Sequence, residues 1–366
     1  MFFKLTLTIR IKMRKLILTT ALTGLVIGGT AIAQTSITGE MRINLKAVSS
    51  KSATPGTTTS NRGFGTEQQI NFSNKGKLSV GGLSYAAGFS LENDGVQVTS
   101  LFNENNYIDI INAASGTTIS FSQDHIQRMD SSRSNSYHFG FDANDMSTSG
   151  VGTSMFSQTG GPGVGQSQTV AIIQDVGTFG KFSYAYAPSL TDSSTTTITT
   201  GAGSSESLTE SDEESAYEVG FVGNLGIKGL NVALFKAEQK TKPGSAVKSE
   251  GEYYGASYTT GAITAGVTRR EYNNDEVLAS AKKELKETHY GLTYVVNPEV
   301  SVNAVYGKVD ASDKAARPND QKIKMIQLGY NLGPVALVAA IAKNEDIGGV
   351  SGNDSDVFMT RLLTAF

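Results

Sequence analysis

Ionisable side chains recur at every second position in the stretch formed by residues 35–47. Glu40, Arg42 and Lys46, with Asn44 between the last two, alternate with residues that are apolar or glycine. A period of two places alternate residues on opposite faces of a β-strand, so these four polar side chains share one face. Carboxylates and cations grouped in this way act on ions and polar solutes through their charge.

Two further arginines belong on polar strand faces by the same reasoning. Near the end of the sequence, Phe358, Leu362 and Phe366 fall on one face, which places Arg361 on the other. Arg270 likewise lies opposite the apolar positions 263, 265 and 267. The sequence therefore predicts a set of basic residues on one continuous surface: Arg42, Lys46, Arg270 and Arg361.

Acidic residues are available in the long polar segment 125–167 and directly before it. The candidates are Asp124, Asp130, Asp142 and Asp145, to which strand residue Glu40 can be added. If the segment faces the arginines, the two sets create a transverse electric field that orients dipolar solutes and disfavours apolar ones. Each aspartate could equally be an ordinary solvated loop residue, and the sequence leaves both interpretations open.

Patterns that would indicate catalysis or metal binding are missing. Gly160 to Gly165 is glycine-rich, but no Lys-Ser/Thr follows it as a phosphate-binding loop requires. His125, His138 and His289 are scattered without metal-ligand spacing, and the sequence has no cysteine. No Gly-x-Ser-x-Gly motif marks a nucleophile. We therefore expect no enzyme activity, no metal and no cofactor.

The elements that position the charged residues are short alternating stretches, and the sequence predicts sixteen of them. We expect strands near 35–47, 64–74, 78–91, 106–112, 117–124, 168–176, 180–188, 216–224, 229–239, 252–260, 262–272, 288–296, 300–309, 322–331, 334–344 and 356–366. A weak repeat of 36 or 37 residues, seen at Tyr217, Tyr254 and Tyr290, recurs once per pair of strands. Because no amphipathic helix accompanies it, the repeat indicates hairpins rather than a helical solenoid.

The connections between these strands alternate in length. Short turns are expected at 74–77, 113–116, 177–180, 226–229, around 261, at 297–299 and at 333–334. Long polar loops lie between them, near 49–63, 92–105, 125–167, 189–215, 240–251, 273–287, 310–321 and 345–355. This sorting is typical of an even-stranded transmembrane barrel with its long loops on one side. A sandwich with Greek-key crossings gives no such order.

The first 33 residues have the pattern of an export signal. Arg14 and Lys15 precede an apolar stretch, and Ala31 and Ala33 form a small-x-small cleavage site, so we expect residues 1–33 to be a signal peptide. Met13 opens a leader of ordinary design and could be the true start. No other long apolar run predicts a transmembrane helix. The formal net charge is −3, which argues against binding to nucleic acid.

Two segments resemble the general porins of Gram-negative bacteria. Tyr107-Ile-Asp-Ile-Ile-Asn, a turn, and Thr117-Thr-Ile-Ser-Phe-Ser-Gln-Asp124 are similar to the strands that lead into the third loop of that family. Val176-Gly-Thr-Phe-Gly-Lys-Phe-Ser-Tyr-Ala-Tyr-Ala-Pro188 is similar to a porin hairpin, and the final Phe366 also fits. One departure is at Ser122-Gln123-Asp124, where the family often has Gly-Arg.

The resemblance implies a particular architecture. It implies an all-β, sixteen-stranded barrel over residues 34–366 in the outer membrane, which associates as a homotrimer among lipid and lipopolysaccharide. It further implies that the third loop, about 125–167, folds into the lumen, and that small hydrophilic solutes and ions diffuse passively through the water-filled barrel. Sixteen strands are enough to leave an aqueous lumen.

The charged residues acquire roles in this arrangement. Arg42, Lys46, Arg270 and Arg361 would line the pore, because arginine facing lipid at mid-depth costs roughly 2 to 4 kcal/mol. The first and last strands must pair to close a barrel, so Arg42 and Arg361 should lie near one another at mid-height. Phe366 would be the residue that the assembly machinery recognises.

Two other functions remain as alternatives. A substrate-selective channel would need a ladder of aromatic or basic residues along several strands. None is evident in the strands, although the loops could contain one. An adhesin would place its function in the loops alone, and nothing in the strand pattern excludes it.

Overall fold

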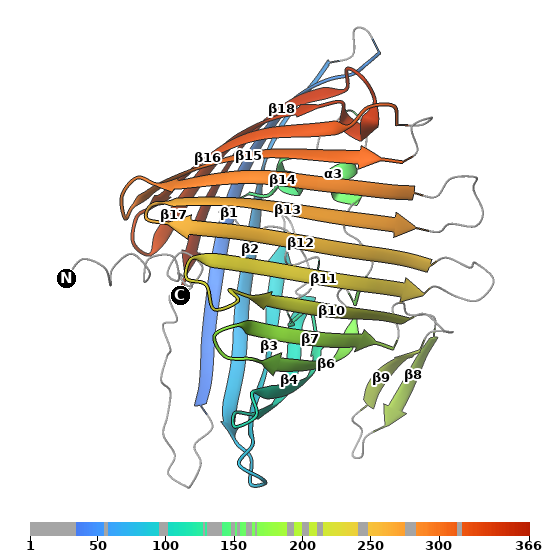
Figure 1. The fold of residues 1–366 in the computed structure, drawn as a ribbon, viewed down its shortest axis with the longest axis vertical. Helices are drawn as coiled ribbons and strands as arrows, with labels where there is room; N and C mark the ends of the chain where they lie inside the picture. The colour runs from blue at the N-terminus through green and yellow to red at the C-terminus, as the bar shows by residue number, and fades with distance from the viewer. Residues whose placement is uncertain are drawn as a thin grey trace.

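The structure, a computed structural model, has the shape of a closed barrel of sixteen antiparallel strands (Figure 1). It describes residues 34–54, 58–94, 102–126, 129, 141–147, 151, 154–158, 163–164, 167–188, 194–199, 205–210, 215–240, 248–274, 283–312 and 317–366. Each strand of the barrel pairs with its neighbour in the chain, apart from the closing pair β1–β18 and the pair β7–β10. The fold class and strand number predicted from the sequence are confirmed.

The barrel strands have the following bounds. They are β1 (Gln34–Lys51), β2 (Thr58–Lys77), β3 (Ser84–Asp94), β4 (Phe102–Asn112), β5 (Thr117–Gln123), β6 (Gln168–Asp175), β7 (Gly180–Ala187), β10 (Ser215–Gly223), β11 (Leu230–Lys240), β12 (Lys248–Thr260), β13 (Ile263–Asn274), β14 (Lys283–Val295), β15 (Val300–Ala311), β16 (Gln321–Asn331), β17 (Val335–Glu345) and β18 (Asp354–Ala365).

Alternation of exposed and buried side chains separates the two faces of the barrel wall. On β18, Phe358 and Leu362 are 40% and 44% exposed on the outer face, whereas Val357 and Met359 on the inner face are buried. Large apolar side chains on the outer face, such as Ile341 of β17, are exposed in the same way. The period-two pattern read from the sequence thus corresponds to an apolar outer face and an inner face that carries the polar residues.

Close backbone packing joins the first strand to the last. Gly39 and Phe366 exchange two backbone hydrogen bonds, with N–O distances of 2.7 and 2.9 Å. A Cβ at position 39 would lie 2.5 Å from Cζ of Phe366, so only glycine fits beneath this ring. Glycine at position 39 and the aromatic ring at position 366 therefore close the barrel together.

Several connections differ from the sequence-based expectation. The first loop, expected at 49–63, is shorter, because β1 continues to Lys51 and β2 already begins at Thr58. The turn after β2 lies at residues 78–83, not 74–77, because Gly81 and Gly82 adopt φ of 65° and 70°, which other residues rarely accept. The long connection 189–215 contains a two-stranded sheet, β8 (Ser194–Thr199) and β9 (Ser205–Glu210), which stands apart from the barrel (Figure 1). Its serine- and threonine-rich sequence lacks the apolar alternation that identified the other strands.

Two short helices lie in the segment between β5 and β6. They are α2 (Ala143–Ser147) and α3 (Met155–Gln158), and a 3₁₀ turn, Ile347–Gly349, follows β17. Apolar residues of this segment pack against the inner wall formed by β14 to β18. The cluster contains Phe141, Met146, Met155 and Phe156 from the segment, with Leu285, Val309, Ile323, Met325 and Val357 among its partners on the wall.

Candidate functional site

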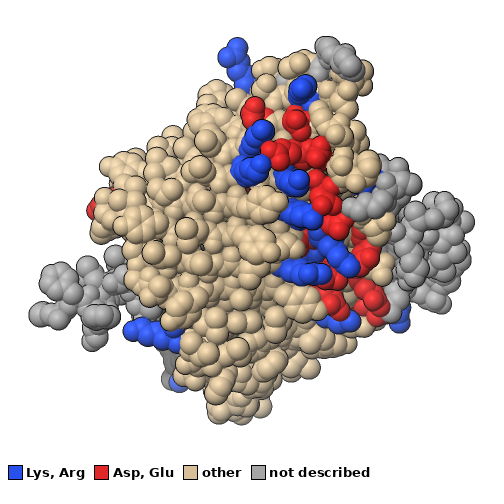
Figure 2. Space-filling model, turned by 45° about the horizontal axis from the view of Figure 1, so that its top comes forward, with Lys and Arg blue, Asp and Glu red and all other residues tan. Residues whose placement is uncertain are grey.

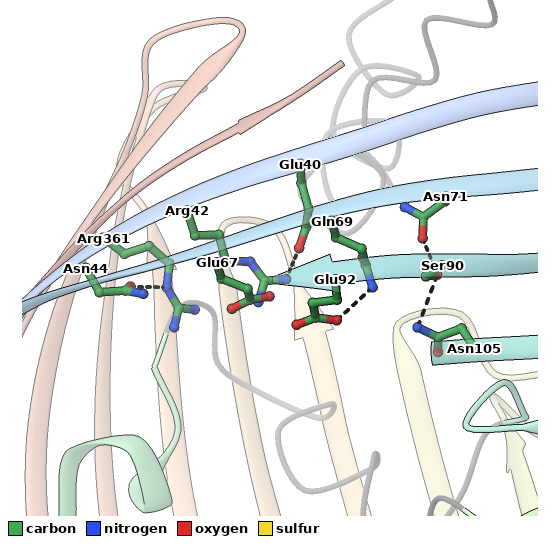
Figure 3. Close-up of polar contacts among 10 residues, drawn as sticks. All are labelled: Glu40, Arg42, Asn44, Glu67, Gln69, Asn71, Ser90, Glu92, Asn105 and Arg361. Atoms are coloured by element: carbon green, nitrogen blue, oxygen red, sulfur yellow. Dashed lines mark hydrogen bonds and ion pairs between the residues drawn. The ribbon is translucent and has the colours of Figure 1, made fainter. Parts of the chain in front are cut away.

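A row of polar side chains crosses the inner face of β18 and of β1 to β4 (Figure 3). We call it the polar row, and it consists of Arg361, Asn44, Arg42, Glu40, Glu67, Gln69, Glu92, Asn71, Ser90 and Asn105. Strand register explains the alignment, because Arg361 lies opposite Asn44 on β1, and Arg42 lies opposite Glu67 on β2. Five neighbouring strands therefore contribute polar groups to one surface.

Arg42 lies between two carboxylates in the polar row. Its guanidinium forms ion pairs with Glu40 from the same strand and with Glu67 from β2. The Arg42 side chain is 29% exposed, and those of Glu40 and Glu67 are 10% and 21% exposed. The positive charge of Arg42 is thus balanced locally, and removing it would leave two carboxylates without this partner.

The rest of the polar row is joined by hydrogen bonds between amides, hydroxyls and one further carboxylate. Gln69 Nε2 donates to Glu92 Oε2 over 3.2 Å. Ser90 Oγ donates to Asn71 Oδ1 over 2.6 Å and accepts from Asn105 Nδ2 over 3.4 Å. Acidic groups therefore belong to the wall itself and not only to the segment between β5 and β6.

Buried side-chain amides of the wall hold the backbone of that segment. Phe141 N donates to Gln327 Oε1 over 2.8 Å, and Met155 N donates to Gln321 Oε1 over 2.7 Å. Asn344 Nδ2 donates to the carbonyl oxygen of Met146 over 2.9 Å. The described parts of the segment are thereby fixed to the inner face of β16 and β17.

Two aspartates lie at the start of α2: Asp142 directly precedes the helix, and Asp145 is in its first turn. Asp142 Oδ1 accepts from Asp145 N over 2.8 Å, and Asp145 Oδ2 accepts from Asp142 N over 3.2 Å. Lys46 Nζ from β1 donates to the backbone oxygen of Asp145 over 2.7 Å. Burial raises the pKa of the Asp145 carboxyl, and the neighbouring Asp142 charge raises it further.

Arg361 joins the polar row to the same segment. Its Nε donates to Asn44 Oδ1 over 2.8 Å, and its Cζ lies 4.6 Å from the ring centroid of Phe141. The fields of Arg361 and Lys46 also reach the Asp145 carboxyl. Two of the basic residues singled out in the sequence, Lys46 and Arg361, thus come together near Asp145. The third, Arg42, acts on Arg361 through its charge and is paired with Glu40 and Glu67.

The other sequence candidates lie elsewhere. Arg270 on β13 is buried and donates to the carbonyl oxygen of Met129 over 3.0 Å, while Glu218 of β10 accepts from Met129 N. Asp124 directly follows β5 with φ of 53°. Asp130 lies outside the described residues. Arg270 therefore contacts the backbone of the segment rather than the polar row.

Comparison of the chain with known proteins identifies the family to which it belongs. Residues 19–349 match the model of a family described as Gram-negative porin. The chain belongs to the Gram-negative porin family. It is a diffusion channel of the Gram-negative outer membrane, as the sequence predicted, and members of this family are channels rather than enzymes.

Solved structures of other porins and outer-membrane proteins have the same fold. The "Anion-selective porin from Comamonas acidovorans" gives a TM-score of 0.67 at 15% identity, over 92% of this chain and 100% of that chain. A loop L8 deletion mutant of OmpT, an outer membrane protein of Vibrio cholerae, gives 0.62 at 12% identity, over 91% and 99%. A mutant of the Rh. blastica porin gives 0.58 at 12% identity, over 91% and 100%. A search of curated proteins gave no match.

Two acidic residues of the porin's polar row were not among the sequence candidates. The alternation of β2 placed Glu67 on the same face as Gln69 and Asn71, so its inward direction was readable from the sequence. Its pairing with Arg42 depends on the register between β1 and β2, which the sequence alone did not provide. Glu92 was missed because β3 was expected to end before it.

Sites of other kinds are absent from the part of the porin that the structure describes. Within those residues, no group of three or more His, Cys, Asp or Glu side chains could hold a metal ion. The helices described there are also too short or too polar to cross a membrane.

Proposed function

We propose that the polar row and the segment 125–167 form the narrowest part of the pore, through which small hydrophilic solutes and ions diffuse. The observation that carries this proposal is that charges of both signs meet on the inner wall. Lys46 and Arg361 lie near Asp145, and Arg42 lies between Glu40 and Glu67. Fixed charges of both signs orient the dipole of a passing polar solute. An apolar solute would have to displace the water that these charges order, so its passage is disfavoured.

The balance of charge indicates weak selectivity between anions and cations. The Comamonas relative is described as anion-selective. In this chain Arg42 is paired with Glu40 and Glu67, and Arg361 and Lys46 lie near two aspartates. Because neighbouring carboxylates largely balance the positive charges of these basic residues, we expect both the cation and the anion of a simple salt to pass.

Single-channel recording in a planar bilayer tests this function. With KCl at different concentrations on the two sides, the reversal potential should be well below the value for a channel that passes one ion alone. Liposome swelling should give rates that fall smoothly as the size of a neutral sugar increases. Saturable transport of one sugar, with exclusion of others of the same size, would instead favour the substrate-selective channel.

We also propose that the outer surface contacts the charged headgroups of lipopolysaccharide. Figure 2 shows Lys, Arg, Asp and Glu gathered in a band on one face of the molecule, and we call this band the charged belt. It includes ion pairs on the outer face of β11 to β17: Lys236–Glu252, Arg269–Glu271, Lys286–Glu284, Lys308–Asp320, Lys324–Glu345 and Lys343–Glu345.

The position of the charged belt supports this assignment. The exposed side chains of Tyr254 and Tyr306 lie on the outer face, two residues along their strands from Glu252 and Lys308. Tyrosine is enriched where the hydrocarbon core of a bilayer meets the headgroups. The charges beyond the tyrosines would therefore lie at headgroup level, where lysines meet phosphate and carboxylates share divalent cations.

Thermal unfolding with purified lipopolysaccharide tests this contact. Lipopolysaccharide should raise the midpoint of unfolding, and the rise should shrink when Lys324 and Lys343 are changed to Gln. Lys181, at the other end of the barrel, provides the control, because Lys181→Gln should leave the rise intact. The proposal would be contradicted if lipopolysaccharide raised the midpoint equally in the wild type, in the Lys324→Gln, Lys343→Gln variant and in Lys181→Gln.

The family resemblance further leads us to propose a homotrimer. Native mass spectrometry of the detergent-extracted protein should give three times the mass of one chain. A monomer that still conducts would contradict the trimer and leave the proposed pore unaffected.

A further inference from the structure

A single buried amide on the wall holds one residue of the segment 125–167 by both of its backbone groups. Gln327 of β16 is fully buried, and its Oε1 accepts from Phe141 N over 2.8 Å. Its Nε2 donates to the carbonyl oxygen of Phe141 over 2.8 Å. Two hydrogen bonds in opposite directions to one residue reproduce the pairing between antiparallel strands. Phe141 is therefore fixed in both position and orientation.

The Gln327 amide is itself oriented by other polar groups of the wall. Its Nε2 also donates to Asn303 Oδ1 over 3.3 Å, and Asn303 Nδ2 donates to Thr293 Oγ1 over 2.9 Å. Asn303 is as completely buried as Gln327. An amide rotated by half a turn would direct its NH₂ group at Phe141 N–H, so only one orientation satisfies these contacts.

The ring of Phe141 contacts the guanidinium of Arg361. Arg361 Cζ lies 4.6 Å from the ring centroid, within the range for attraction between a cation and an aromatic face. On β1, Asn44 Oδ1 accepts from Arg361 Nε. The guanidinium is thus held by the wall through Asn44 and by the segment through Phe141.

We propose that Gln327 is a positioning residue for ion selection: it fixes Phe141 and, through the Phe141 ring, the guanidinium of Arg361. The inference rests on the proposed role of Arg361 in the pore. A contiguous series of contacts then runs from Thr293 on β14 through Asn303, Gln327, Phe141 and Arg361 to Asn44 on β1. Ion selectivity depends in this way on a fully buried amide that permeating ions do not touch.

Gln327 could instead hold the segment without affecting Arg361, and a double-mutant comparison separates the two roles. Gln327→Met keeps the length of the side chain and removes both hydrogen bonds to Phe141. If Gln327 acts through Arg361, Gln327→Met should shift the reversal potential in the wild-type background and not in the Arg361→Ala background. A purely structural role would give the same shift in both backgrounds.

The expected shift has a direction and an independent control. Gln327→Met and Phe141→Leu should each move selectivity in the same direction as Arg361→Ala, by a smaller amount. Gln174→Met is the control, because the Gln174 amide also accepts from Thr117 and donates to the carbonyl oxygen of Ser115, near the turn after β4. Gln174→Met should not change selectivity.

A second measurement follows the segment directly. The chain has no cysteine, so Ala143→Cys, at a buried position in α2, introduces a single thiol. Gln327→Met removes the two buried hydrogen bonds to Phe141. In this background the thiol at position 143 should react with a methanethiosulfonate reagent about tenfold faster or more. Folded, heat-modifiable barrel must be verified for each variant.

The results distinguish failure of the inference from failure of the proposed function. If Arg361→Ala changes the reversal potential and Gln327→Met does not, the inference is wrong and the proposed pore stands. If Arg361→Ala has no effect, the role of Arg361 in the pore is wrong, and the inference fails with it. Gln327→Met could also speed thiol modification and shift the reversal potential equally in the wild-type and Arg361→Ala backgrounds. That result would show that Gln327 only holds the segment, and the inference would be wrong.

Discussion

Arg361 and Asn44 form a hydrogen bond of 2.8 Å across the junction of the last and first strands. The two residues are separated by 317 positions in the chain, and the closing pair β1–β18 places them opposite each other. The polar row therefore crosses the junction that closes the barrel. Any change that alters the register of β1 against β18 should also change the pore.

Closure of the barrel predicts a strong effect at Phe366. Deleting Phe366 removes two backbone hydrogen bonds to Gly39 and the ring that covers it. The amount of folded protein in the outer membrane should fall several-fold while synthesis continues, as measured by heat-modifiable mobility on gels. A normal amount of folded barrel from the deletion variant would contradict this.

The same contact predicts an effect at Gly39. Gly39→Val would place a branched side chain against the Phe366 ring, at a cost of about 1 to 3 kcal/mol. The midpoint of thermal unfolding should therefore fall. Gly63→Val is the matched control on β2, because a Cβ there has no neighbour within 4 Å. Equal unfolding midpoints for the two variants would count against the contact.

The raised pKa of Asp145 predicts a pH-dependent selectivity. Because burial and Asp142 raise this pKa, Asp145 becomes neutral, as pH falls, before an ordinary aspartate does. Selectivity should then move toward anions above the pH range in which ordinary aspartates titrate. Asp145→Asn should abolish this step, whereas Asp175→Asn, on β6, should retain it. The reversal potential measured over a pH series checks both.

The same shift has a consequence for stability. The folded protein holds the Asp145 proton more tightly than the unfolded chain does, so this carboxyl contributes most to stability at low pH. The contribution is lost as pH rises from the ordinary aspartate pKa through the raised one. Thermal unfolding of Asp145→Asn should lack this part of the pH dependence, and an unchanged profile would contradict the assignment.

The signal-peptide pattern of residues 1–33 predicts the N-terminus of the mature protein. Cleavage after Ala33 should leave Gln34 as the first residue of the mature chain, which N-terminal sequencing of membrane-extracted protein can show. Residues 1–33 lie outside the described structure, so this remains a prediction from the sequence. A mature protein that keeps its leader would contradict it.

Local periodicity explains which parts of the structure were predictable. Alternation along β1 and β18 predicted the direction of Arg42, Lys46 and Arg361. Successive residues of a strand point to opposite faces, so the face of each residue can be read from the sequence of that strand alone. The turn after β2 was misplaced because both Asn74-Lys-Gly-Lys77 and the Gly81-Gly82 pair are turn signals, and only the structure shows which one reverses the chain.

Contacts between the wall and the segment 125–167 were not predictable in this way. Gln327 is a neutral side chain in an ordinary strand, and nothing in its neighbours indicates that it holds Phe141, 186 residues away. The contact between the buried Arg270 and the carbonyl oxygen of Met129 was equally unpredictable. Such pairs depend on how a loop folds back onto the wall, which strand periodicity does not record.

The reversal potential of the Arg42→Ala, Arg361→Ala double variant tests the central claim most directly. Removing both guanidiniums, and leaving Glu40 and Glu67 without Arg42, should move selectivity toward cations while conductance rises or holds. The shift should shrink in 1 M salt, where the Debye length is about 3 Å, against about 10 Å at 0.1 M. Arg62→Ala, outside the polar row, is the control and should behave like wild type. An unchanged reversal potential for the double variant, measured on verified folded protein in a low-salt gradient, would contradict the assignment of the polar row to the narrowest part of the pore.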